Sequence, residues 1–193
     1  MTVTCPIFAL KMKYYLNPAG RPIYFHELGE QLYGSFFIFT VQGRTGIQSE
    51  RFEIIIPPIY EAIKPAFGLH FWGKLQKRWR LYSFENLPVG AHSFRRVKPF
   101  NLEYAAVSID GKSWGFTDRL GNMVIPPNYL SGDYLGLDYF AVAVLKKDRH
   151  CFGVTDRSGN IIVPFKLESK PTFSETIHYL LKKRKPLREW LKL

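Results

Sequence analysis

The stretch WGFTDRLGNMVIPP at residues 114–127 decides the fold, because it returns at residues 152–165 as FGVTDRSGNIIVPF. Seven residues of the first copy recur in the second, each displaced by 38 positions. They are Gly115, Thr117, Asp118, Arg119, Gly121, Asn122 and Pro126, which return as Gly153, Thr155, Asp156, Arg157, Gly159, Asn160 and Pro164. Self-similarity at a fixed period of this length is the signature of a repeat architecture. We therefore expect tandem copies of one supersecondary unit.

Each clear copy predicts a β-hairpin. An aromatic and β-branched run is followed by a turn with a glycine suited to positive φ, and then by a second apolar run. Pro126 and Pro127 end that second strand, because neither can donate a ladder hydrogen bond. A tyrosine, an irregular stretch and an alternating strand at 139–145 complete the unit, and the turn at 146–150 feeds the next one. This predicts three short strands per unit, about fifteen in all.

Weaker copies extend the repeat toward the N-terminus. One begins at Gly46, one at Trp79 with Arg80 in the glycine position, and a worn one runs from Tyr14 through Gly20 to Ile23. The fold class is therefore all-β, with about five tandem units near 14–44, 45–78, 79–113, 114–151 and 152–170. They form a single domain over residues 1–170, as a propeller-like ring or an open stack. No unit can bury its own apolar face, so neighbouring units must stack.

The repeated side chains have structural interpretations. Trp114 and Phe152 are expected to pack between units, and the glycines to relieve backbone crowding or to adopt positive φ. Asp118 and Asp156 precede turn glycines, where an aspartate closes the turn with its own side chain.

Composition excludes several classes of protein. Hydrophobic residues make up 46% and aromatic residues 16% of the 193 residues, enough for a substantial core. No apolar run reaches the 18 or more residues that a membrane span needs. Met1 to Leu10 lacks a basic n-region and a cleavage site. The two cysteines, Cys5 and Cys151, are too few for a disulfide scaffold. We expect a cytoplasmic protein that does not bind a membrane.

The excess of positive charge is confined to two blocks of the sequence. The formal net charge is +11, of which 64–100 contributes +7 and 166–193 contributes +5, leaving −1 for all other residues. Such a distribution is typical of an electropositive face that attracts an acidic protein or a phosphate backbone. Clustered solubility charge is the alternative interpretation.

No pattern of catalytic residues is visible. Gly111-Lys112-Ser113 lacks the upstream glycine of a phosphate-binding loop, and strand rather than helix follows it. The five histidines never stand at the spacing of zinc ligands. We therefore expect no catalytic residues, no metal and no cofactor, hence no enzyme.

The C-terminal block, 171–193, predicts a basic amphipathic helical tail. Thr172 and Glu175 form a capping box, and Ile177, Leu180 and Leu181 mark an apolar face. Pro186 is expected to open a second short helix. The tail is interpreted first as a cap packed on the last repeat, with a partner-docking helix and a membrane-surface or nucleic-acid contact as alternatives.

The middle block interleaves positive charge with aromatic rings. Alternation along 78–82 places Trp79 and Leu81 on one face and Arg78, Arg80 and Tyr82 on the other. The predicted partner-binding residues are cationic side chains with one aromatic anchor. They are Trp72, Lys74, Lys77, Arg78, Arg80, Arg95, Arg96 and Lys98.

Residues 113–118, Gly121-Asn122, 124–127 and Tyr129 together resemble the WG repeat, a bacterial repeat named for its Trp-Gly pair. The resemblance implies tandem β-hairpin units, a role in binding other proteins and no catalytic residues. The leading hypothesis is a non-enzymatic binding module, in its most specific form an immunity-type inhibitor that occludes an acidic partner such as a bacterial toxin. A nucleic-acid-associated protein and a structural scaffold module are the alternatives.

Overall fold

The computed structural model describes residues 13–16, 22–25 and 29–183. Most of the described chain forms four antiparallel sheets, each built from four strands that are consecutive in the sequence. Sheet I holds β3 (Gln31–Tyr33), β4 (Phe36–Val41), β5 (Arg44–Ser49) and β6 (Ile54–Tyr60). Sheet II holds β7 (Ala62–Pro65), β8 (His70–Leu75), β9 (Arg78–Ser83) and β10 (Pro88–Phe94). Sheet III holds β11 (Arg96–Asn101), β12 (Tyr104–Ser108), β13 (Trp114–Asp118) and β14 (Met123–Tyr129). Sheet IV holds β15 (Ser131–Gly136), β16 (Tyr139–Lys146), β17 (Arg149–Asp156) and β18 (Ile161–Leu167).

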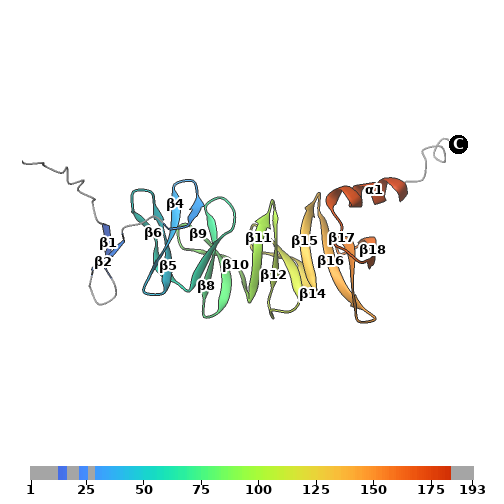
Figure 1. Cartoon of the computed structure of the whole chain (residues 1–193), viewed down its shortest axis with the longest axis horizontal. Helices are drawn as coiled ribbons and strands as arrows, with labels where there is room; N and C mark the ends of the chain where they lie inside the picture. Colours follow the sequence, from blue (N-terminus) through green and yellow to red (C-terminus); the bar gives the residue numbers. More distant parts are fainter. Residues whose placement is uncertain (1–12, 17–21, 26–28, 184–193) are drawn as a thin grey trace, which may run out of the picture.

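The four sheets stand one behind another in an open row (Figure 1). The all-β repeat prediction is confirmed, and of its two forms the structure has the open stack rather than a propeller-like ring. At the N-terminal end, β1 (Lys13–Leu16) and β2 (Pro22–Phe25) pair as a two-stranded sheet of their own, with Tyr14 opposite Tyr24. Gly20, which belongs to the worn first copy, lies outside the described residues.

Each sequence unit contains four strands rather than the predicted three. The stretch after Tyr129, predicted to be irregular, is β15. Its sequence SGDYLG has low strand propensity, but pairing with β16 holds it, from Ser131 opposite Ala143 to Gly136 opposite Tyr139. The units expected to start near 45, 79, 114 and 152 begin at β5, β9, β13 and β17, the third strand of each sheet. Each complete unit therefore gives two strands to one sheet and two to the next.

The repeated Gly and Pro residues lie together at a β-bulge in each of sheets I, III and IV. In sheet III, Phe116 faces Ile125 but Trp114 faces Tyr129, so β14 carries two extra residues at its prolines. This bulge brings the β14 backbone onto Gly115, where a Cβ would overlap the Ile125 carbonyl oxygen. Gly46 and Gly153 meet the carbonyl oxygens of Ile56 and Val163 in the same way. The expectation that these glycines relieve backbone crowding is confirmed.

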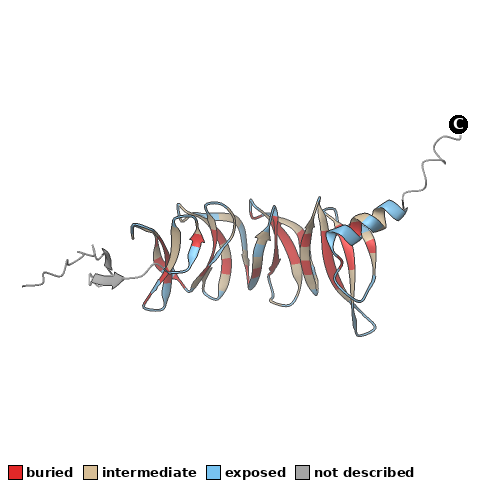
Figure 2. Cartoon of the chain, turned by 45° about the horizontal axis from the view of Figure 1, so that its top comes forward, coloured by how far each residue is buried: buried red, intermediate tan, exposed pale blue. Residues whose placement is uncertain are grey.

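The core lies between the sheets, as the buried stripes across each sheet in Figure 2 indicate. Neighbouring strand residues point to opposite faces, so the buried strand β12 sends Ala105 and Val107 toward sheet II and Tyr104 and Ala106 toward sheet IV. Three clusters fill the three interfaces of the row. They include Ile47, Ile56, Tyr60 and Phe71 between I and II, Trp72, Leu81, Phe94 and Val107 between II and III, and Phe116, Phe140 and Val142 between III and IV.

The helix α1 (Phe173–Lys183) follows sheet IV and lies against β18 (Figure 1). The capping box is confirmed: the Thr172 N–H donates to a Glu175 carboxylate oxygen at 2.7 Å, and the Glu175 N–H donates to Thr172 Oγ1 at 3.2 Å. Ile177 and Leu180 are half-buried, whereas Leu181 is exposed. The second helix predicted at Pro186 falls outside the described residues.

Candidate functional site

A basic groove opens between sheets II and III, where the two sheets meet at one edge of the row. Its volume is about 420 Å³. It is lined by Lys64, Trp79, Arg95, Arg96, Val97 and Trp114. No carboxylate is among these lining residues, so we define them as the basic groove and consider what holds its cations in place.

Indole faces, rather than carboxylates, position the cations of the groove. Lys64 Nζ lies 4.7 Å from the ring centroid of Trp79, and Lys74 Nζ lies 5.7 Å from it. Arg96 Cζ lies 5.9 Å from the centroid of Trp114. A cation over an aromatic face is held by the ring quadrupole and keeps its full charge. The groove is therefore an electropositive site in which two of the three lining cations, Lys64 and Arg96, are ordered by indole faces without being neutralised.

Three of the predicted binding residues are committed to other contacts. Arg78 donates to Ser93 Oγ at 2.8 Å and to the Ser93 carbonyl oxygen at 2.7 Å. Arg80 donates to the Gly90 carbonyl oxygen at 3.1 Å. Arg80 itself occupies the strand position at which the other sheets have glycine. Lys98 lies over Trp114 at 5.3 Å but forms an ion pair with Asp133 at 3.0 Å. These contacts fix the edges of neighbouring strands, and of the three cations only Lys98 is paired with a carboxylate.

Trp72, which the sequence predicts to be an aromatic anchor, is a core residue in the structure. Its side chain is fully buried between sheets II and III and stacks on Phe100, with ring centroids 5.6 Å apart. In the alternating strand β8, Trp72 points into an interface that the sequence did not reveal, because both faces of an inner sheet are covered. Lys77, by contrast, lies exposed in the turn between β8 and β9, where its backbone N–H donates to the Glu61 carboxylate at 3.2 Å.

The structure adds four residues to the predicted site: Lys64, Trp79, Val97 and Trp114. Both tryptophans occupy the first position of the repeated Trp-Gly pair, and the sequence predicts packing between units for Trp114 and one face of an alternating strand for Trp79. Trp79 is indeed 7% exposed and belongs to the core cluster, whereas Trp114 is half-buried. Their shared place in the repeat was the available signal, since equivalent positions of stacked sheets come together at one edge.

The basic groove belongs to a longer basic edge. This edge comprises the turns between the second and third strands of each sheet and the connections that follow each fourth strand. Counted with the strand residues up to three positions from these turns and connections, it contains fifteen Lys and Arg residues and five Asp and Glu residues. The cations are Arg44, Lys64, Lys74, Lys77, Arg78, Arg80, Arg95, Arg96, Lys98, Lys112, Lys146, Lys147, Arg149, Lys166 and Lys170, and the acids are Glu61, Asp110, Asp133, Asp148 and Glu168. The β16–β17 hairpin at the lower right of Figure 1 marks this edge.

Three of these acids are engaged within the fold: Glu61 with the Lys77 N–H, as described above, and also Asp110 and Asp133. The backbone N–H groups of Lys112 and Ser113 donate to Asp110 and lower its pKa to about 2. Asp133 accepts from both Lys98 and Lys170, at 3.0 and 3.1 Å. They therefore oppose the positive potential of the edge only locally.

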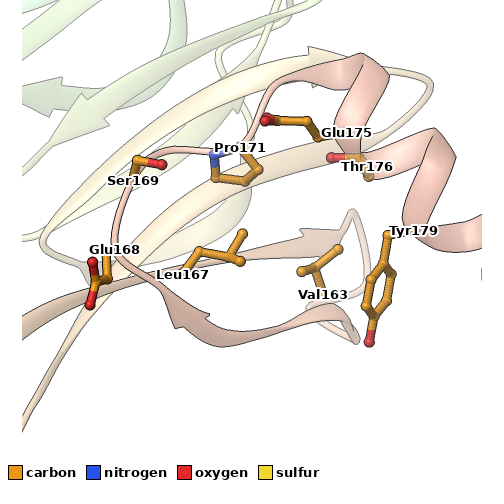
Figure 3. A pocket seen from close by; sticks show the side chains of 8 residues that line it. All are labelled: Val163, Leu167, Glu168, Ser169, Pro171, Glu175, Thr176 and Tyr179. Carbon is orange, nitrogen blue, oxygen red and sulfur yellow. The ribbon is translucent and has the colours of Figure 1, made fainter.

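A second hollow, of about 300 Å³, lies where α1 meets sheet IV (Figure 3). Val163, Leu167 and Tyr179 form its apolar wall. Its carboxylates are Glu168 and Glu175, of which Glu175 is engaged in the capping box. These contacts describe a helix junction rather than a set of reactive groups.

The repeated aspartates are turn residues, as predicted. Asp118 Oδ1 accepts the N–H groups of Leu120 and Asn122 at 2.9 and 2.8 Å. Asp156 makes the same bonds with Ser158 and Asn160. In the described ranges no three His, Cys, Asp or Glu side chains gather as metal ligands would. Nor does any helix in those ranges have the length and apolar character to cross a bilayer.

The fold and the groove together define a repeat-based binding or scaffold module made of stacked β-sheets. Residues 114–129, which span β13 and β14, match the family model of the WG containing repeat. The chain is a WG-repeat protein. No curated protein matches it.

Proposed function

We propose that this chain is a non-catalytic module that binds an acidic protein through the basic groove. The observation that carries the proposal is the set of cations held over Trp79 and Trp114 with no carboxylate among the residues that line the groove. Ordered cations lose less conformational freedom when they bind a carboxylate, since their side chains are already placed. The surrounding basic edge steers an acidic partner toward the groove.

The geometry favours acidic protein over nucleic acid as the partner. Nonspecific single-strand binding depends on open aromatic faces on which bases stack. Here Trp79 is 7% exposed, and the indole of Trp114 carries Arg96 and Lys98 at its face. The rings thus hold cations rather than offering a stacking platform.

The test uses poly-L-glutamate of defined length as the acidic probe, with binding followed by tryptophan fluorescence. Reversing charge at the groove in the Arg95→Glu, Arg96→Glu double variant is expected to weaken binding about tenfold or more, about 1.4 kcal/mol. The matched control reverses two exposed cations that lie outside the basic edge, Arg51→Glu in the β5–β6 turn with Arg157→Glu in the β17–β18 turn, and is expected to change affinity less than about twofold. Equal losses in the two double variants would remove the groove from consideration.

A parallel binding series with duplex DNA tests the alternative that the protein is associated with nucleic acid. Phosphate contacts give a log affinity that falls linearly and steeply with log salt concentration. If DNA binds more tightly than polyglutamate at the same ionic strength and the groove variant removes that binding, the protein is associated with nucleic acid.

The most specific form of the proposal is an immunity-type inhibitor that covers the active site of an acidic toxin. It is supported by the charge of the basic edge, which favours rapid association. Its test is inhibition of a candidate toxin that depends on Arg95 and Arg96, with an association rate that falls as salt is raised. Inhibition that persists in the groove variant would exclude this form.

A further inference from the structure

The edge opposite the basic edge carries a row of exposed leucines. This edge comprises the turns between first and second strands and between third and fourth strands, which an antiparallel meander places at the same end of each sheet. Five leucines in these turns are 57 to 71% exposed. They are Leu69 and Leu87 in sheet II, Leu102 and Leu120 in sheet III, and Leu137 in sheet IV. We define these turns as the leucine edge.

Contacts between sheets show that these turns form one continuous edge. The Arg119 guanidinium, in the β13–β14 turn, lies 5.2 Å from the ring centroid of Phe67 in the β7–β8 turn. Arg119 also donates to the Leu102 carbonyl oxygen at 2.8 Å. Between sheets III and IV, Tyr104 Oη donates to Asp138 Oδ1 at 2.8 Å. The leucines therefore belong to one surface along the long axis of the row.

A hollow of about 590 Å³ lies on this edge between sheets III and IV. Leu102 and Leu137 stand in its lining, 65% and 71% exposed, together with the acidic side chains of Glu103 and Asp138. Arg119 also lines the hollow, where its guanidinium donates to the Leu102 carbonyl oxygen. Solvent-exposed leucines around a hollow are unfavourable in isolation, and apolar surface rimmed by charge is typical of an interaction site.

The charge of the leucine edge is opposite to that of the rest of the protein. Together with the one strand residue on either side of each turn, its turns contain seven acidic and three basic residues, in a chain of net charge +11. The acids are Glu50, Glu53, Glu85, Glu103, Asp118, Asp138 and Asp156, and the cations are Arg51, Arg119 and Arg157. The chain is thus polarised across its width, and the leucine edge is complementary to a cationic partner.

The spacing of the leucines selects the shape of that partner. Sheets packed face to face are about 10 Å apart, so Leu69, Leu102 and Leu137 recur at about that interval. Seven residues of an α-helix rise about 10.5 Å, so a helix with leucines at heptad spacing matches the row. We propose that the leucine edge binds a cationic amphipathic helix of a partner protein, laid along the row with its apolar face on the leucines.

The test uses a synthetic helix of leucine and lysine with leucines at heptad positions, and measures its affinity by fluorescence anisotropy. The Leu102→Ser, Leu137→Ser double variant is expected to weaken binding about tenfold, and Glu103→Lys about threefold. The matched control is Leu145→Ser, an equally accessible leucine at the end of β16 beside the basic edge, 56% exposed. It should change affinity less than about twofold.

Several results would overturn the proposal. One is equal binding of a scrambled peptide whose leucines are not on one face, or of a leucine and glutamate peptide. Another is a loss in Leu145→Ser as large as in the double variant. A third is self-association of the protein that the double variant abolishes, without peptide binding, which would make a second copy the occupant. All four substituted positions, three on the leucine edge and one in the control, are exposed, so circular dichroism should show native folding in every variant.

Discussion

Replacing Gly115 with alanine should destabilise the array by a predictable mechanism. A Cβ at this position would overlap the Ile125 carbonyl oxygen and lie 2.7 Å from both the Pro126 carbonyl carbon and the Pro127 nitrogen. Real Cβ atoms do not approach backbone so closely, and backbone cannot rotate away as a flexible side chain can. The β14 bulge must therefore retreat by several tenths of an ångström, which weakens ladder hydrogen bonds and the packing of Ile125. We expect a loss of about 2–4 kcal/mol in the free energy of unfolding.

The matched control is Gly159→Ala in the β17–β18 turn. There φ is +83° and no atom lies within 4 Å of the added Cβ, so only backbone strain opposes alanine. That strain costs about 1 kcal/mol. Urea unfolding followed by tryptophan fluorescence should give a clearly lower midpoint for Gly115→Ala than for Gly159→Ala. If the two variants lose the same stability, the repeated glycine is not required by the bulge, and our account of the Gly and Pro positions is refuted.

Three further predictions concern ionisation, capping and the groove. Burial, with help from Asp138, raises the pKa of Tyr104 to about 12, so its contribution to stability is complete below pH 10 and is lost as pH rises toward 12. Unfolding measured across that range should show a decline that Tyr104→Phe flattens; an unchanged slope would contradict it. Thr172→Ala removes the N-cap of α1 and should cost the helix about 1 kcal/mol, seen as faster amide hydrogen exchange in its first turn while sheet IV remains protected. Asp133→Asn releases Lys98 and Lys170 from their ion pairs, so the affinity for polyglutamate should rise about twofold to threefold with a stability change under about 1 kcal/mol; a fall in affinity would count against the groove.

The sequence contained enough information for the repeat, its hairpins and its turn chemistry. Gly-Asn turns and aspartates that bond their own backbone act locally, so Asp118 could be interpreted correctly without neighbours. The prediction that Pro126 and Pro127 end the second strand was wrong, because β14 continues through both prolines to Tyr129, with a bulge in its pairing with β13. The helix start at Thr172 is a local signal of the same kind. The WG resemblance joined these signals into an all-β array.

Other features depend on contacts between distant segments. β15 is a strand because β16 pairs with it, not because SGDYLG prefers extended structure. Trp72 is buried because sheet III covers that face of sheet II. The opposite charges of the basic edge and the leucine edge could not be predicted from the sequence either. Basic and acidic turns alternate along the chain, and only the antiparallel meander places them at opposite edges. Positive blocks in the linear sequence located part of the basic edge and none of the leucine edge.

The offset between sequence unit and sheet affects how such a protein can change its length. A duplicated or deleted stretch of one full period, cut anywhere, rejoins equivalent strands and restores complete sheets, because each missing strand is supplied by its counterpart in the adjoining copy. A loss of half a period leaves two strands without the other two of their sheet. Whether the array tolerates a deletion therefore depends on whether a whole number of periods is removed, and not on where the deletion begins. Removing residues 114–151 should leave a shorter folded row, whereas removing residues 131–151 should not.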